Sequence, residues 1–465
     1  MTFDVAIIGG GISGLTTAYD LHQRGFKVVL LERQQQIGGN AISEYINGFL
    51  MEHGPTTLNA MVPQALALSK QMGLSDQQVD LGKAITHRYL REGNDLHGIA
   101  INPAGFLLSP YLSPMGRISL LLEGFRKCRT GCEEESVYAF AARRFGKEFA
   151  ARVMDPLVAG MFGGDAEQLS MSAAFPTLLE MEQTHGSITR GIIKAKRGSE
   201  PAKRLFSFRK GVATLPQSLA AVLGDVVRTG VTVRSLQRGS AFGANGYKIT
   251  THRHGTLSAR AVVLAVQPHV ASQLLEPLDA VGASAIAQID APPMSVSFFG
   301  YRREQVGHPL DSLGFLSLKD SGGIITGAQF LSTMFEGRAP DGHVAISAYV
   351  GGVRNREVAK MNSKDLLVQV HNELSSLLQI KGPPILARCR QWPRSLPQYT
   401  LGHADRMADI MAVSDRYQGL FLTGNYIGGV SIANCISQAY STATNVDLCL
   451  KANKTINCEK QYISQ

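Results

Sequence analysis

Residues 4–32 constrain the fold more than any other stretch of this chain. They contain an apolar run, the glycine-rich turn GGGISG, an amphipathic segment, a second apolar run and a closing glutamate. This order predicts a strand, a tight turn, a helix and a second, parallel strand. A glycine pattern is weak evidence by itself, but within a complete βαβ unit it indicates that a dinucleotide binds here.

Each position of the turn has a physical role in this interpretation. Gly9 permits the tight turn, Gly11 lets the backbone approach a pyrophosphate, and Gly14 allows the helix to pack closely on the sheet. The helix N-terminus offers free N–H groups to phosphates, and Glu32 can accept hydrogen bonds from ribose hydroxyls. The alternative is a glycine-rich turn without a ligand. The residues assigned to the cofactor in this unit are Gly9, Gly10, Gly11, Ile12, Ser13, Gly14 and Glu32.

The composition is that of a globular protein and argues against several classes. A length of 465 residues suggests two or three domains, and no apolar run approaches the ~20 residues that span a bilayer. The motif begins so close to Met1 that no cleaved presequence is expected, which favours a cytoplasmic location. The six cysteines form no CxxC pair, so neither a disulfide framework nor a metal site is expected. The net charge of +9 suits an anionic lipid or substrate, and no nucleic-acid motif is present.

Two further segments favour a flavin over a nicotinamide cofactor, which the first motif alone leaves open. Residues 37–40 (IGGN) predict a loop around the adenosine side of a dinucleotide, and residues 52–57 (EHGPTT) permit close approach to an isoalloxazine ring. Near the C-terminus, Gly428 and Gly429 precede a predicted helix whose N-terminus can stabilise an anionic reduced flavin. The expected cofactor is therefore FAD.

The expected fold is α/β, with a discontinuous Rossmann-like FAD-binding domain, a mixed-sheet substrate domain and an inserted helical domain. The FAD-binding parts are predicted at residues 1–80, 205–272 and 413–451, and the substrate domain at 81–102 and 273–412. Residues 103–204 have apolar side chains at helical spacing and predict the helical domain. A strand is expected over residues 44–51, and a flexible tail over residues 452–465.

The most specific segment is 153–187, which reads VMDPLVAGMFGGDAEQLSMSAAFPTLLEMEQTHGS. With FLSTMFEGRAP, WPRSLPQYTLGH and LTGNYIGGVSIANC further along, it resembles the protoporphyrinogen and coproporphyrinogen oxidases of the flavin amine oxidase superfamily. The likeness runs from residue 4 to about residue 448. Two departures leave the substrate less certain: Lys210 stands where the family often has glycine, and residues 433–437 replace an often polar or acidic segment.

The resemblance implies further FAD contacts. Val233 would contact the adenine side through its backbone, while Trp392 and the residues from 430 to 432 would lie near the flavin. Asn40 could equally face solvent, and Trp392 could be an ordinary core residue. The assigned residues beyond the first unit are Arg33, Asn40, Gly54, Pro55, Thr56, Thr57, Val233, Trp392, Val430, Ser431 and Ile432.

The resemblance also implies a reaction and a substrate site. The family removes six electrons and six protons from a porphyrinogen in three two-electron steps, with molecular oxygen as acceptor and peroxide as product. Arg88 would bind a carboxylate arm, with Arg91 as the fallback, and Gly160 would present its backbone to the reacting ring. The ring would be flanked by Leu313 and Phe330; on spacing alone both are core residues, and Arg88 is a surface arginine. No residue is assigned as an acid or base, because pyrrole protons can leave to solvent. His53 is the nearest candidate and is expected to be structural.

The favoured function is oxidation of protoporphyrinogen IX to protoporphyrin IX in haem biosynthesis. The alternatives are coproporphyrinogen III oxidation, an amine oxidase or desaturase with another substrate, and a non-catalytic flavin-bound tetrapyrrole carrier. Amine oxidases commonly hold a lysine near the flavin, and residues 293–301 contain none. Residues 106–125 are apolar, interrupted by proline and followed by basic residues, which fits either a peripheral site on the inner face of the cell membrane or a buried helical subdomain. Ferrochelatase and a second copy of the chain are candidate partners.

Overall fold

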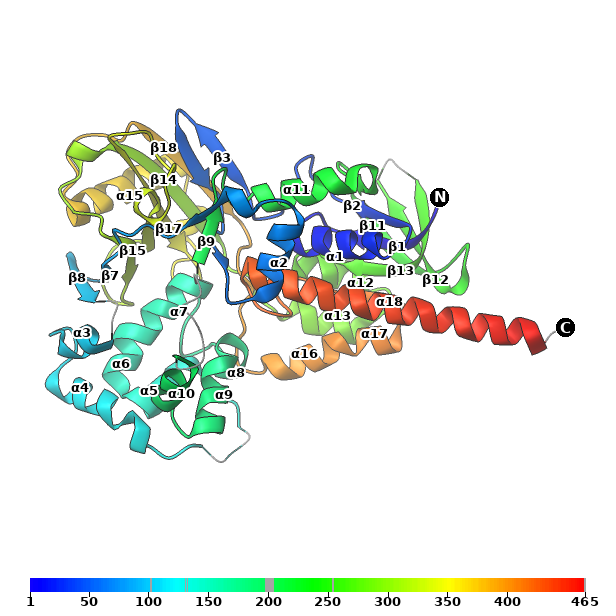
Figure 1. Cartoon of the computed structure of the whole chain (residues 1–465), viewed down its shortest axis with the longest axis horizontal. Coiled ribbons are helices and arrows are strands. Elements are labelled where there is room, and N and C mark those ends of the chain that lie inside the picture. Colours follow the sequence, from blue (N-terminus) through cyan, green and yellow to red (C-terminus); the bar gives the residue numbers. More distant parts are fainter. Residues whose placement is uncertain (101–102, 130, 132, 197–204, 253–254, 464–465) are drawn as a thin grey trace.

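The protein has two large sheets and a separate group of helices, as the computed structural model in Figure 1 shows. The structure describes residues 1–100, 103–129, 131, 133–196, 205–252 and 255–463. Parts of the predicted segments that fall at residues 101–102, 197–204, 253–254 and 464–465 lie outside the described residues. The α/β class expected from the sequence is confirmed.

The first sheet is built around the predicted βαβ unit. Strand β1 pairs in parallel with β2 on one side and with β13 on the other, and β19 continues the parallel set beside β13. β11, β12 and the first half of β13 form an antiparallel meander. The strands are β10 (Val227–Arg228), β2 (Val28–Leu31), β1 (Thr2–Ile8), β13 (Thr256–Leu264), β12 (Gly243–Thr251), β11 (Val233–Ser240) and β19 (Leu420–Leu422).

Helices cover both faces of this sheet, because its central strands are buried on both sides. One face packs against α1 (Ile12–Gln23), α2 (Pro63–Gln71), α11 (Thr214–Leu223) and α18 (Ile432–Ile463). The other face packs against α12 (Pro268–Leu275), α13 (Ala280–Ala287), α16 (His403–Met411) and α17 (Val413–Arg416). Helices α13 and α16 therefore lie with the cofactor sheet, although the sequence placed them in the substrate domain of residues 273–412.

The predicted flexible tail is the second difference. Helix α18 runs from Ile432 to Ile463 and projects beyond the body of the molecule (Figure 1). No glycine or proline occurs after Gly429, so nothing in the sequence breaks the helix. Residues 452–463 are therefore helical rather than an irregular tail.

The second sheet is mixed and has α15 (Ser363–Leu378) on one face. Its apolar side chains on that face pack under α15, while the opposite face packs against Phe49 and Met51 and against the helical region. The strands, in spatial order, are β18 (Leu386–Trp392), β14 (Met294–Arg302), β17 (His343–Gly351), β16 (Ile325–Phe330), β15 (Ser312–Ser317), β7 (His87–Glu92) and β8 (Asp95–Ala100). The short helix α14 (Leu331–Met334) follows β16.

Residues 44–51 do not form one strand. They contribute to a hairpin of β3 (Ser43–Ile46) and β4 (Phe49–Glu52), because Asn47 and Gly48 both have positive φ and make the turn. An Asn-Gly pair between strands is a strong hairpin signal. A second small sheet contains β5 (Leu58–Asn59), β9 (Leu205–Phe208) and β6 (Gln78–Asp80).

The predicted helical region is present between β8 and β9. Its apolar core includes Val137, Phe140, Val158, Phe162 and Met171. A π-helical stretch, Ala150–Met154, joins α6 to α7. The helices are α3 (Pro103–Leu108), α4 (Pro114–Leu121), α5 (Val137–Phe145), α6 (Lys147–Phe149), α7 (Asp155–Phe162), α8 (Met171–Ala174), α9 (Pro176–His185) and α10 (Ile188–Lys196). None of the helices in the described ranges is long and apolar enough to cross a membrane.

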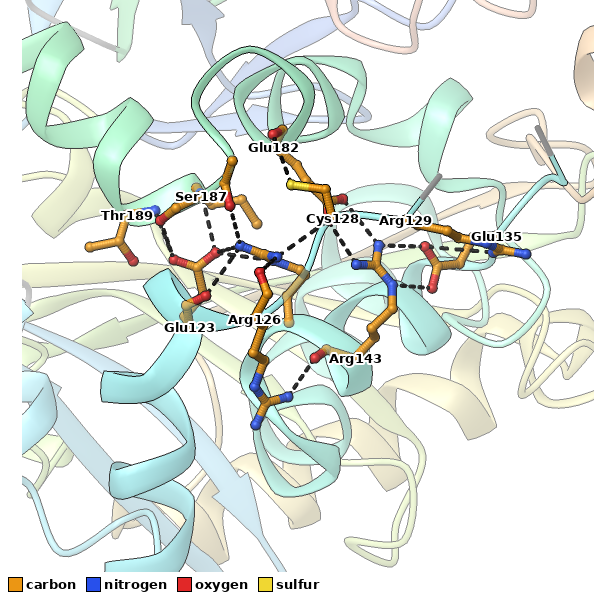
Figure 2. Close-up of polar contacts among 12 residues, drawn as sticks. Glu123, Arg126, Cys128, Arg129, Glu135, Arg143, Glu182, Ser187 and Thr189 are labelled. Carbon is orange, nitrogen blue, oxygen red and sulfur yellow. Dashed lines mark hydrogen bonds and ion pairs between the residues drawn. The ribbon is translucent and has the colours of Figure 1, made fainter. Parts of the chain in front are cut away.

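Buried charges hold these helices together (Figure 2). The carboxylate of Glu123 accepts hydrogen bonds from Arg144, from the Ser187 hydroxyl at 2.6 Å and from the Thr189 amide at 3.2 Å. Burial alone would raise the pKa of Glu123, but these hydrogen bonds outweigh it and lower the pKa to about 2. Arg143 bridges Glu135 and Glu182 in the same way, so this group, which we call the helical charge network, is closely paired.

Candidate functional site

The glycine turn has the geometry that its sequence predicts. Gly9 has φ +113°, and a Cβ there would collide with the carbonyl of Ala265. A Cβ on Gly14 would collide with the carbonyl of Gly9, so both positions require glycine. At Gly11 the nearest atom to an added Cβ is the Gly39 Cα, 3.9 Å away, so the space above Gly11 is open.

The first helix begins directly at this open space. Gly11 is the N-cap residue of α1, and no side chain caps the helix. Ile12 and Ser13, in the first turn, are buried, as is Gly14. Uncapped N–H groups and the positive end of the helix dipole favour an anion such as a pyrophosphate at this position.

Glu32 lies at the end of β2 and faces the turn. Its carboxylate accepts hydrogen bonds from the amides of Gly10 at 2.6 Å and Gln34 at 2.7 Å. The chain just before β11 reaches the same place, because the Val231 amide donates to the Glu32 carbonyl at 2.8 Å. Val233 begins β11, two residues later, while Arg33 is exposed beside Glu32. The structure thus brings Glu32, Arg33 and Val233 to one end of the site.

A second loop lies against the glycine turn. The Gly38 amide donates to the Gly10 carbonyl at 2.8 Å, and Gly39 lies against Gly11. Asn40 continues this loop and contacts Gly54 so closely that a Cβ on Gly54 would collide with the Asn40 carbonyl. The glycine turn and the loop that begins at Gly54 are therefore joined by the segment containing Asn40.

At the far end of the site, Trp392 is tied to the loop that begins at His53. Its indole Nε1 donates to the His53 carbonyl at 2.7 Å. The His53 Nε2 lies 3.0 Å from the Glu44 carboxylate, and burial lowers the pKa of His53. These contacts are those of a structural histidine. The loop continues through Gly54, Pro55, Thr56 and Thr57, of which Thr56 is buried.

The start of α18 lies beside the start of α1. Ser431 caps α18 by accepting a hydrogen bond from the Asn434 amide at 3.1 Å, and Ile432 packs in the same apolar cluster as Ile12. Burial raises the pKa of Cys435 to about 11, and Ser13 hydrogen-bonds to this thiol. Val430 instead packs against the helical region. Two helix N-termini therefore meet at one site, with the helical region at its border.

Arg88 lies on the face of the second sheet that α15 does not cover. A row of paired residues crosses this face from Arg390 on β18 through Val296 and Tyr349 to Leu316 and Leu90, and Arg88 is two residues before Leu90 on β7. The side chain is accessible to solvent, yet surrounding protein atoms lower the pKa of Arg88. Within the described ranges Arg88 has no ion-pair partner, so its charge is available to an anionic ligand.

The remaining predicted substrate residues divide between two faces. Gly160 on α7 packs against the Leu316 side chain and is exposed, and α7 lies over β15 and β16. Leu313 is partly buried next to the cluster that contains Phe298 and Phe49. Phe330 is completely buried under α15 with Phe315, on the other face of the sheet. The structure therefore brings together Arg88, Gly160 and Leu316 but not Phe330.

Sequence reasoning missed several polar groups at this face. Glu52 is completely buried just before His53, and burial raises its pKa to about 7 although it accepts hydrogen bonds from Ser43 and the Val212 amide. Tyr349 donates to Gln329 at 2.8 Å. Arg390 stacks on Trp392, with its guanidinium carbon 4.3 Å from the ring centroid. The one available signal was the alternation in β18 (LARCRQW), which places Arg388, Arg390 and Trp392 on one side.

The residues fit an elongated dinucleotide. One end of the site has the Glu32 carboxylate, the two glycine-rich loops and the open N-terminus of α1. The other end has the indole of Trp392, His53 and buried polar atoms that have no partner among the described residues. Those atoms include the His53 Nδ1 and the Arg390 Nε. In the described ranges no group of three His, Cys, Asp or Glu side chains could hold a metal ion. The fold and site define a dinucleotide-binding flavoprotein with a separate substrate sheet.

Comparison with known proteins identifies the family. The family model for flavin containing amine oxidoreductases matches residues 12–447, and the chain belongs to this family. The chain is 31% identical to protoporphyrinogen oxidase 1, chloroplastic, of Arabidopsis thaliana, over 96% of this chain and 88% of that protein. It is 24% identical to coproporphyrinogen III oxidase of Bacillus subtilis (strain 168), over 95% and 97%. A crystal structure assigned as a protoporphyrinogen oxidase from Exiguobacterium sp. 255-15 has TM-score 0.83 at 22% identity, covering 96% of this chain and 98% of that one.

The protein is therefore an FAD-dependent oxidoreductase. When bound, FAD supplies a two-electron acceptor, which no side chain of this site could replace. The open N-terminus of α1 and the Glu32 carboxylate are the groups that would hold its phosphates and a ribose.

Proposed function

We propose that this protein oxidises protoporphyrinogen IX to protoporphyrin IX in haem biosynthesis, with FAD as cofactor and molecular oxygen as acceptor. The plant relatives that bear the name protoporphyrinogen oxidase support the substrate class. In this reaction the substrate loses six electrons and six protons in three steps. Each step reduces one oxygen molecule to one molecule of hydrogen peroxide, so that three molecules of peroxide balance one porphyrin.

The observation that carries the proposal is Arg88, which has no ion-pair partner among the described residues, on the open face of the second sheet. A porphyrinogen is an apolar macrocycle with carboxylate arms, and such a ligand needs aliphatic walls and a cation. Leu316 and Leu90 provide apolar surface next to Arg88, and Gly160 lies opposite Leu316. We assign Arg88 to a carboxylate arm and Gly160 and Leu313 to the ring. Phe330 would act only from behind the sheet, by supporting β16.

The proposed FAD contacts follow the two ends of the site. Glu32, Arg33 and Val233 would hold the adenosine, and the turn from Gly9 to Gly14 would hold the pyrophosphate. Asn40, the loop from Gly54 to Thr57, Trp392 and the start of α18 would surround the flavin. No side chain needs to act as a base, because the pyrrole protons can pass to solvent. The Nε2 atom of His53 is already hydrogen-bonded to the Glu44 carboxylate.

Coproporphyrinogen III is the alternative substrate, since a Bacillus relative carries that name. An amine oxidase or desaturase reaction is less well supported, because β14 contains no lysine that could lie near the flavin. A non-catalytic flavin-bound tetrapyrrole carrier would bind both porphyrinogens and oxidise neither.

The test is to assay the purified protein with each porphyrinogen under air, following porphyrin fluorescence and peroxide. Arg88→Ala should raise KM about 10- to 100-fold, because a charge-assisted hydrogen bond contributes about 1.5–3 kcal/mol. Flavin content should stay unchanged, and Arg302→Ala at an exposed end of β14 is the matched control. A protein that binds FAD but oxidises neither substrate contradicts the proposed reaction. An unchanged KM in Arg88→Ala contradicts the carboxylate assignment alone.

We further propose that the helical region rests peripherally on the inner face of the cell membrane. Met115, Leu121 and Phe125 are 73%, 61% and 81% exposed, and with Ile118 and Leu122 they follow helical spacing along α4 and the short segment Leu122–Phe125. Exposed apolar side chains beside the exposed Lys127 suit an anionic lipid surface. Sedimentation with anionic vesicles should fall on Phe125→Ser; equal sedimentation of the variant and the parent protein would contradict this site. Ferrochelatase or a second copy of the chain would be a partner at the same location.

A further inference from the structure

Arg390 is a cation at the candidate site, and none of the roles assigned above involves it. It lies on β18 opposite Val296, on the face of the second sheet that carries Arg88 and Tyr349. Alternation along the strand puts Trp392 on the same side and Cys389 with Gln391 on the α15 side. Arg390 is therefore directed toward the cofactor loops rather than toward the core under α15.

The guanidinium is held in place but its charge is not paired. It stacks on the Trp392 ring, with its guanidinium carbon 4.3 Å from the ring centroid. Its Nε is buried and has no hydrogen-bond partner. In the ranges that the structure describes, Arg390 also forms no ion pair. A buried, unpaired donor on a cation is costly, so such a group in a native protein calls for an anionic partner.

The site itself indicates where that partner lies. Trp392 is bonded to the His53 carbonyl, and the next residues are Gly54 and Pro55, which the flavin ring would contact. The positive charge of Arg390 lowers the pKa of His53, after the larger effect of burial. Burial and Arg390 both favour the neutral form of His53, and Arg390 is the cation beside Trp392 and this loop.

We propose that Arg390 supplies a fixed positive charge beside the flavin ring and stabilises the anionic reduced cofactor relative to the oxidised one. The charge acts electrostatically without a direct bond to the ring, and stacking on Trp392 fixes the position of the guanidinium. The amine oxidase pattern places a lysine near the flavin, and this chain, whose β14 has none, would place its cation on the neighbouring strand.

The test uses the FAD-loaded protein without any porphyrinogen, so it does not depend on the proposed substrate. Sulfite binds to flavins as an adduct that places negative charge on the ring, and its dissociation constant reports this charge stabilisation. Arg390→Gln should raise the sulfite dissociation constant about tenfold or more, and the two-electron midpoint potential should fall by about 30 mV for each tenfold change. Arg390→Lys, which retains the charge, should stay close to the parent protein.

Arg388→Gln is the matched control, because Arg388 lies two residues earlier on the same strand and face and is exposed. It should leave both quantities unchanged. If Arg390→Gln loses its flavin, Arg390→Met is measured instead, since its apolar stem can keep the packing on Trp392. Unchanged sulfite affinity and potential in a flavin-loaded charge-removing variant overturn the proposal.

Discussion

The helical charge network and the open face of the second sheet use arginine in opposite ways. Glu123 and Arg144 are completely buried, and each has several hydrogen-bond partners. Arg88 and Arg390, in contrast, have no ion-pair partner in the described part of the chain, and the Arg390 Nε lacks any partner. A buried charge that the protein itself satisfies holds elements together, whereas a charge left unsatisfied marks a place for a ligand.

The largest expected effect is in the helical charge network. Glu123→Gln removes the carboxylate nearest to the buried Arg144 and leaves only Glu182, 3.4 Å away, as its counter-charge, so the loss of unfolding free energy approaches the about 3–5 kcal/mol typical of a broken buried ion pair. Urea unfolding followed by circular dichroism measures this loss, and the flavin spectrum of the folded protein should not change. The matched control is Glu133→Gln, since Glu133 is exposed and pairs with Arg129 at the surface. A loss no larger than that of Glu133→Gln would contradict the structural role of the network.

The buried carboxyl groups of Glu52 and Glu123 should affect the pH dependence of the unfolding free energy in opposite directions. The pKa of Glu52 is raised to about 7, so the folded protein holds an extra proton between pH 4.5 and 7, and unfolding free energy falls as the pH rises through this window. The size of that loss is about 3 kcal/mol. The pKa of Glu123 is lowered to about 2, so its contribution is present above pH 4.5 and is lost as the pH falls toward 2. The stability difference between parent and Glu52→Gln should therefore change from pH 5 to pH 7.5. A constant difference would mean that Glu52 does not titrate there.

The glycine turn provides a smaller and more selective test. A Cβ at Gly11 meets no protein atom closer than 3.9 Å, so Gly11→Ala should leave the flavin-free protein as stable as its parent. The methyl group would nevertheless keep the pyrophosphate from the N–H groups of α1. Flavin affinity should fall about 10- to 100-fold, the loss expected for one or two hydrogen bonds to a charged group. Gly124→Ala, whose Cβ would have ordinary contacts, is the control; full flavin retention in Gly11→Ala would disprove the assignment of the turn.

The smallest expected effect compares two helix caps. Ser136 caps α5 in the helical region, and Ser431 caps α18 at the site. Replacing either with alanine should lower unfolding free energy by about 1 kcal/mol. Only Ser431→Ala should also shift the flavin absorbance, because only that cap lies in the proposed flavin site. A similar shift in both variants would mean that the flavin absorbance responds to the loss of overall stability and not to the cap at the site.

The elements built from contiguous residues were predictable. The βαβ unit, the buried strands and the helical region follow from periodicity and from glycines whose role is local. The hairpin at residues 43–52 was also within reach, because Asn47-Gly48 is a turn signal. The burial of Phe330 under α15 could not be predicted, because residue type does not reveal which face of a central strand a helix covers.

By itself the sequence determined the glycine turn and its βαβ unit, since the strand, turn and helix signals all lie within residues 4–32, although the carbonyl of Ala265 and the loop at Gly38 and Gly39 also lie against the turn. Tertiary structure alone decided which charges are satisfied. Glu123 meets Ser187 64 residues away, and Trp392 meets His53 339 residues away. Pairing of this kind depends on which faces the fold brings together, and local propensity carries no information about it. The same amino acid is thus a structural tie at Arg144 and a free cation at Arg88 and Arg390.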